Sequence, residues 1–105
     1  VFSTSPRDSF LPHMVAVARE ASLPLCFYRV RRRPGDVRRS ETPHLQRYLR
    51  DLSAYLRSAG CHLVDESRDE RITVDMYADG DHLAAHAKQR YAPIFLSHIR
   101  PLLDR

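Results

Sequence analysis

An α/β fold with parallel strands is predicted by the order of segments along this chain, which reads helix, strand, helix, strand, helix. Two strands joined by a crossover helix form a βαβ unit, which is almost always right-handed. Two strands alone make a poor sheet. We therefore expect residues 1–105 to be a single domain that is one part of a larger α/β domain. Apolar periodicity marks helices at 9–22, 43–59 and 83–103, and short apolar runs mark strands at 23–30 and 61–65.

The first helix is predicted by its start signal and its spacing. Asp8 or Ser9 can cap the helix, and Pro12 is tolerated in the first turn. The apolar residues that recur at helical spacing are Phe10, Met14, Val17, Ala18 and Ala21.

The two strands differ in length. Leu23–Val30 is almost continuously apolar, which is typical of a strand buried on both faces of a parallel sheet. The second strand, residues 61–65, ends at Asp65, for which capping of the next turn is favoured over a role in a site. Cys26 and Cys61 open the two runs. We expect two buried free thiols, and a disulfide between neighbouring strands stays open.

The second helix has clear boundaries. Thr42 suits the cap, Pro43 the first helical position, and Gly60 the stop just past the end. The apolar face consists of Leu45, Leu49, Leu52, Tyr55 and Leu56.

The third helix follows a loop over residues 66–78. Pro93 and Pro101 are expected to kink or divide it. One side carries Tyr91, Ile94, Phe95, His98, Ile99 and Leu102. Core packing is expected for Tyr91, as it is for Tyr48 and Tyr55.

The composition limits the setting in which the chain works. No apolar run approaches the roughly 20 residues of a membrane span, so no span is expected. The chain begins at Val1, which indicates a processed chain or a piece of a longer one. Lys88 is the only lysine, a usage that suggests a GC-rich bacterial genome and leaves the cytoplasm and the periplasm open.

Arginine supplies the positive charge, which is +4 in formal net terms with a pI of about 9.5. Most of the excess lies in one loop, with Arg29, Arg31, Arg32, Arg33, Arg38 and Arg39. A solvated loop is the favoured interpretation. Nucleic acid or another polyanion is the alternative, but no aromatic residue is interleaved for base stacking, which argues against nucleic acid.

The strongest chemical signal is a pair of residues, Asp79 and His82, just before the third helix. A carboxylate three residues before an imidazole can orient the ring and stabilise its protonated form, so that the imidazole serves as a general base. Two other interpretations stay open. Asp79 can simply cap the helix, or Asp81 and His86 can join the pair as metal ligands.

The segment Asp79-Gly80-Asp81-His82-Leu83 resembles the last conserved block of the SGNH, or GDSL-like, hydrolase superfamily. The preceding strand with its basic-proline end, Tyr28–Pro34, and the order of elements fit as well. The similarity covers nearly the whole chain but only the C-terminal half of the family's fold. Ala84 and Ala87 stand where family members often carry Asn and Gly. Within this superfamily, the chain most resembles the SGNH-like group that includes exopolysaccharide O-acetyltransferases.

The resemblance implies a fold, a chemistry and a set of site residues. The fold would be part of a flavodoxin-like, three-layer α/β/α domain. Asp79 would orient His82, the base of a Ser-His-Asp triad in an esterase or acyltransferase. The loop with Arg31, Arg32 and Arg33 follows the C-terminal end of a strand, so in such an enzyme it would lie near the active site and recognise an acidic substrate such as a uronate-rich polysaccharide. The substrate would be an acyl ester or an acidic polysaccharide. No metal and no organic cofactor are implied.

The nucleophile and the oxyanion donors of such a triad have no counterpart in the sequence. Ser3, Ser5 and Ser9 do not follow a strand in the Gly-Asp-Ser context of the family. We therefore expect a missing N-terminal half, a partner chain or a homodimer to complete the sheet and the site. The alternatives are a catalytically silent module that binds carbohydrate or protein, and a basic nucleic-acid-binding domain.

Overall fold

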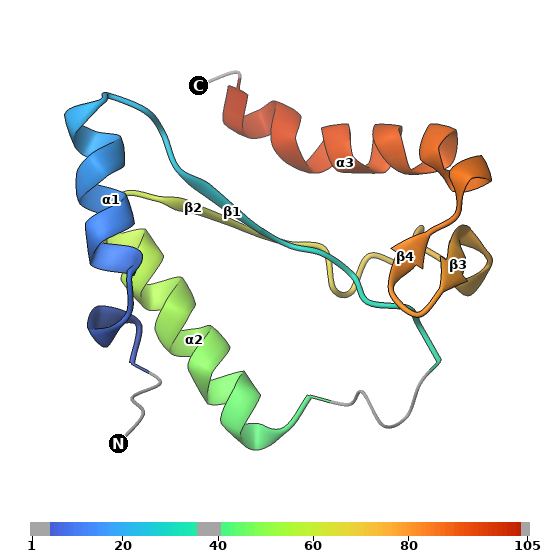
Figure 1. The fold of residues 1–105 in the computed structure, drawn as a ribbon, viewed down its shortest axis with the longest axis horizontal. Helices are drawn as coiled ribbons and strands as arrows, with labels where there is room; N and C mark the ends of the chain where they lie inside the picture. Colours follow the sequence, from blue (N-terminus) through green and yellow to red (C-terminus); the bar gives the residue numbers. More distant parts are fainter. Residues whose placement is uncertain (1–4, 36–40, 104–105) are drawn as a thin grey trace. The chain divides into compact units, whose positions relative to one another are not determined.

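The computed structural model describes residues 5–35 and 41–103. It mixes helices and strands, as predicted for an α/β protein (Figure 1). No helix within the described ranges is long and apolar enough to cross a membrane. The main elements are α1 (Leu11–Glu20), β1 (Cys26–Arg29), α2 (Pro43–Ser58), β2 (His62–Asp65), β3 (Tyr77–Asp79), β4 (His82–Leu83) and α3 (Lys88–Leu103).

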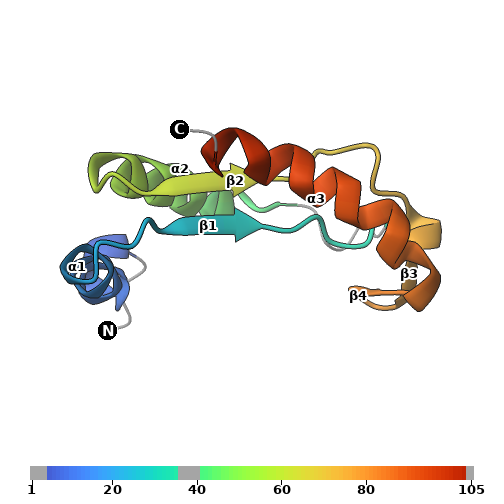
Figure 2. The same ribbon diagram turned by 90° about the horizontal axis from the view of Figure 1, so that it is seen from above.

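Strands β1 and β2 form the predicted parallel pair, and their arrows point the same way in Figure 2. The His62 amide donates to the Leu25 carbonyl at 3.0 Å, and the Glu66 amide donates to the Arg29 carbonyl at 2.9 Å. The prediction that residues 23–30 are buried on both faces is wrong for the described chain. Leu23 is 64% exposed and Val30 is 57% exposed, because β1 pairs with β2 alone among the described strands.

The chain divides into two compact units. Within its described residues, the first unit contains α1, α2 and the first halves of β1 and β2. The Thr42 hydroxyl caps α2 by accepting from the Leu45 amide at 3.1 Å, as the sequence predicts. Gly60 follows the helix with φ +75°, a conformation that glycine adopts without a steric penalty.

Few of the described side chains in the first unit are buried. They include Pro6, Val15 and Leu56. The apolar side chains that predict α1 are largely exposed, since Phe10 is 84% exposed and Val17 is 51% exposed. The periodicity therefore predicts the helix correctly, but most of its apolar stripe lies outside the core of the described residues.

The second unit contains the remaining strand halves, the β3–β4 hairpin and α3. Its core is a cluster of Ile72, Met76, Ala87 and Ile94, against which Tyr77, Leu83 and Tyr91 pack. The third helix is shorter than predicted, because it begins at Lys88 and residues 82–83 form β4. Helix α3 also continues through Pro93 and Pro101 without interruption.

Candidate functional site

Asp79 and His82 form the predicted pair, although on a hairpin and not at the entrance to a helix. Asp79 ends β3, His82 begins β4, and Gly80 turns between them with φ +46°. The antiparallel register places Asp79 opposite His82. Asp79 Oδ1 lies 3.0 Å from His82 Nδ1. The helix-cap interpretation of Asp79 is therefore wrong, because the helix begins nine residues after it.

The pair is open to solvent. The side chain of Asp79 is 84% exposed and that of His82 is 86% exposed. No described residue forms a hydrogen bond with His82 Nε2. The imidazole is thus oriented through Nδ1 and presents its other nitrogen outward, which is the arrangement a general base needs.

The predicted arginine residues approach this hairpin through Asp81. Arg32 Nε lies 3.3 Å from Asp81 Oδ2, and the Arg33 backbone amide donates to Asp81 Oδ1 at 3.0 Å. Arg32 and Arg33 precede Asp81 by almost fifty residues, so this proximity comes from the fold of the second unit. The structure brings two of the three predicted substrate-binding residues into contact with Asp81, the residue that precedes His82.

Arg31 is held differently from its neighbours. Its Nη1 donates to the Ser67 carbonyl at 3.0 Å, and its buried Nε has no hydrogen-bond partner among the described residues. Its backbone is also anchored, because its carbonyl accepts from the Tyr77 hydroxyl and its amide donates to Glu66 Oε1 at 3.1 Å. The Arg31 side chain is therefore turned toward residues of the second unit.

Arg29 and Asp65 are the next charged residues near the arginine loop. Arg29 pairs with Asp65, with Nη1 3.4 Å from Oδ2. Asp65 also accepts from the Ser67 amide at 2.9 Å, which is the turn-capping role favoured from the sequence. Arg38 and Arg39 lie outside the described residues, as does Ser3.

The metal interpretation finds no support in the described ranges, where no three His, Cys, Asp or Glu side chains gather into a possible site. His86 Nε2 instead lies 3.2 Å from the Asp75 carbonyl oxygen, and Asp81 is engaged by Arg32 and Arg33. The metal interpretation also needs His82 and His86 one turn apart on a helix, but His82 belongs to strand β4.

The cysteines are both free, as favoured from the sequence. Cys61 is partly buried. Cys26 is exposed, so the expectation of burial is wrong for it. The exposure follows from the open face of β1, whose first position is the most accessible of the strand.

Sequence reasoning missed a buried carboxylate at the end of β2. Glu66 is only 2% exposed. It accepts hydrogen bonds from the hydroxyls of Tyr28 and Tyr91 and from the Arg31 amide. Burial and then the Glu66 hydrogen bond raise the pKa of Tyr91 to about 12, and the same causes raise the pKa of Tyr28 still further. A lone Glu after a strand gives no signal that tyrosines from two distant segments converge on it.

A second Asp–His pair was also missed. Asp69 Oδ2 lies 2.8 Å from His98 Nε2, and Arg71 donates to both Asp69 oxygens. The Asp69 side chain is 9% exposed and that of His98 is 24% exposed. The Arg71 hydrogen bonds hold the pKa of Asp69 well below its usual range. The short Asp-x-Arg spacing was visible in the sequence, whereas the contact with His98 comes from residues 29 positions apart.

No protein-family model matches the chain, and neither curated proteins nor solved structures include a significant match. Its relation to the SGNH hydrolases therefore stays a prediction that depends on the residues quoted for it.

Proposed function

We propose that this chain contributes the acid and the base of a Ser-His-Asp triad to an SGNH-like esterase or acyltransferase. In the complete protein the fold would be a flavodoxin-like, three-layer α/β/α domain. The observation that carries the proposal is the 3.0 Å contact between Asp79 Oδ1 and His82 Nδ1, which leaves Nε2 facing outward.

The chemistry assigns each residue a separate step. Asp79 holds the ring so that Nε2 points toward the nucleophile, and its charge stabilises the imidazolium as it forms. His82 Nε2 takes the proton from a serine hydroxyl as the hydroxyl oxygen attacks the acyl carbon. His82 then returns the proton to the departing alcohol oxygen. A water or a second alcohol releases the acyl group, giving hydrolysis or transfer.

The nucleophile comes from outside the described chain. No described serine forms a hydrogen bond with His82. The exposure of His82 leaves room for a serine-bearing segment to cover it. Strands β1 and β2 pair only with each other among the described strands. A missing N-terminal half, a partner chain or a second copy would extend this sheet and bury the hairpin.

The arginine loop favours an acidic substrate. Arg33 has an exposed side chain that forms no hydrogen bond or ion pair with a described residue. The side chain of Arg32 is 61% exposed and forms an ion pair with Asp81. An acidic polysaccharide that carries ester groups would place carboxylates near Arg33 and an acyl carbon near His82.

The test uses the protein expressed from its complete reading frame. Ester hydrolysis is measured with p-nitrophenyl acetate, and a fluorophosphonate probe reports an activated serine. We expect His82→Ala to lower kcat by at least a hundredfold and to abolish labelling, with a smaller loss for Asp79→Asn. His44→Ala is the matched control, because His44 is exposed and has no hydrogen bond with a described residue. Equal activity in the His82 and His44 variants would refute the proposal.

A catalytically silent binding module is the second candidate, and the solvent exposure of the pair favours it. An Asp–His pair that is more than four-fifths exposed works in high dielectric, where electrostatic assistance is weak. If the complete protein lacks activity and labelling but binds acidic oligosaccharide through Arg33, this candidate replaces the first. Nucleic acid is disfavoured, because Arg29 and Arg32 are paired with carboxylates and Arg31 is turned inward.

A further inference from the structure

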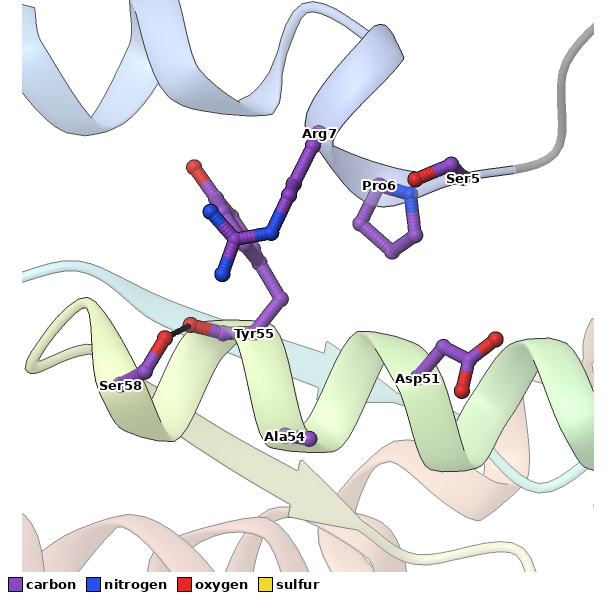
Figure 3. Close-up of a pocket in the computed structure, with 7 residues that line it drawn as sticks. All are labelled: Ser5, Pro6, Arg7, Asp51, Ala54, Tyr55 and Ser58. Atoms are coloured by element: carbon purple, nitrogen blue, oxygen red, sulfur yellow. Dashed lines mark hydrogen bonds between the residues drawn. The ribbon is translucent and has the colours of Figure 1, made fainter.

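A pocket lies in the first unit, between the N-terminal segment and α2 (Figure 3). Its volume is about 330 Å³, at the small end of the range for ligand sites. The helix contributes side chains spaced three and four residues apart, so they share one face. The lining residues are Ser5, Pro6, Arg7, Asp51, Ala54, Tyr55 and Ser58.

Two opposite charges line this pocket without neutralising each other. Arg7 comes from the short 3-10 helix Pro6–Asp8, and its guanidinium carbon lies 5.8 Å from the Tyr55 ring centroid. Its side chain forms no hydrogen bond or ion pair with a described residue. Asp51 rises from α2 and forms no ion pair or hydrogen bond within the described ranges.

The order of these charges along the pocket follows from the helix. Tyr55, which Arg7 covers, lies four residues after Asp51, a separation of about 6 Å along the helix axis. The guanidinium of Arg7 lies over the Tyr55 end of this stretch of α2, whereas the Asp51 side chain points toward the other end, as Figure 3 shows. Nonpolar atoms of Pro6 and Ala54 line the space with them, as Figure 3 shows.

We propose that this pocket binds a small zwitterion, such as a free amino acid, with its carboxylate on Arg7 and its ammonium group on Asp51. A guanidinium can take a carboxylate through two parallel hydrogen bonds. A simple anion gains this contact but is repelled by Asp51, and a simple cation is repelled by Arg7. A molecule that carries both charges satisfies both groups at once.

The prediction is tested by titrating the protein and following backbone amide resonances by two-dimensional NMR. The probes are glycine and γ-aminobutyrate, which differ in the distance between their charges, with acetate and methylammonium as single-charge references. We expect saturable shifts at the amides of Ser5, Arg7 and residues 51–58 with one of the zwitterions, and at least tenfold weaker binding of acetate and methylammonium.

Charge-removing variants decide whether both groups take part. Arg7→Gln and Asp51→Asn are each expected to weaken zwitterion binding at least tenfold. Arg50→Gln and Glu20→Gln make the same charge changes outside the pocket and should leave the affinity unchanged. Equal binding of acetate, equal effects of the control variants, or no saturable shift with either zwitterion would overturn the proposal. The result is independent of the proposed esterase role, since Asp79 and His82 belong to the other unit.

Discussion

The hydroxyl of Tyr91 on α3 donates to the carboxylate of Glu66 at the end of β2, with the Tyr91 oxygen 3.0 Å from Oε2. Tyr28 donates to the same carboxylate, and the Arg31 amide donates to its other oxygen. Glu66 thus fixes the backbone at the start of the arginine loop. The next residues of that loop, Arg32 and Arg33, hold Asp81 between the two members of the candidate site. A buried carboxylate therefore positions the loop that flanks the exposed pair.

Glu66→Gln should destabilise the protein, because an amide nitrogen replaces one of the carboxylate oxygens that accept these hydrogen bonds. The buried amide nitrogen would face groups that also donate, so at least one polar group would lack a partner. Such a group costs about 1–3 kcal/mol. Urea denaturation followed by tyrosine fluorescence measures the loss. Glu70→Gln is the control, since Glu70 is exposed and should change stability by less than about 0.5 kcal/mol. Equal stability of the two variants would show that Glu66 is not buried among these donors.

Stability should fall in alkaline solution because of the same cluster. The folded-state pKa of Tyr91 is raised to about 12 and that of Tyr28 lies higher still, whereas an unfolded tyrosine titrates near about pH 10. The stabilisation is fully present below about pH 10 and is lost as the pH rises through the folded-state pKa. Tyr91→Phe should lower stability at neutral pH and flatten its decline above about pH 10. Tyr48→Phe should lose stability with rising pH as steeply as the wild-type protein. The same steepness in Tyr91→Phe and Tyr48→Phe would contradict the prediction.

Local signals in the sequence predicted α2 and the two strands beside it, and the reason is physical. The Thr42 cap, Pro43 at the first helical position and Gly60 after the end of α2 act within one turn of chain, so their effect can be read from neighbouring residues. The two strands and their parallel pairing follow from apolar runs on either side of that helix.

Contacts between distant segments could not be predicted in the same way. Nothing local indicates that Asp69 meets His98, or that Arg33 meets Asp81. The hairpin was missed because its strands are only two and three residues long, too short for a period-two pattern to register. The Asp79–His82 spacing predicted the contact correctly, but a turn at Gly80 brings it about and not a helix.

The Asp69 cluster should govern stability in acid. Arg71 and then His98 donate to Asp69 and lower the pKa of its carboxyl below the ordinary value of about 4. The stabilisation is present above about pH 4 and is lost as the pH falls through the lower, folded-state pKa. Asp69→Asn should cost about 1–3 kcal/mol at neutral pH and should weaken the dependence of stability on pH between neutral and acid solution. Urea denaturation across this range measures both. Glu70→Gln should show the same loss of stability in acid as the wild-type protein. If Asp69→Asn also shows that loss unchanged, Asp69 is not its source.

The Asp79–His82 pair should contribute almost nothing to stability, in contrast to Asp69 and His98. Both side chains are more than four-fifths exposed, and exposed ion pairs contribute about 0–1 kcal/mol. We expect Asp79→Asn and His82→Ala to change the free energy of unfolding by less than about 0.5 kcal/mol, measured by urea denaturation. The comparison is His98→Ala, which removes a hydrogen-bond partner of the 9% exposed Asp69 and should cost more. A loss above about 1 kcal/mol in His82→Ala would give the pair a structural role. A loss of activity in that variant would then reflect unfolding. If the stability of His82→Ala is unchanged, a loss of activity can be assigned to the chemistry of the imidazole.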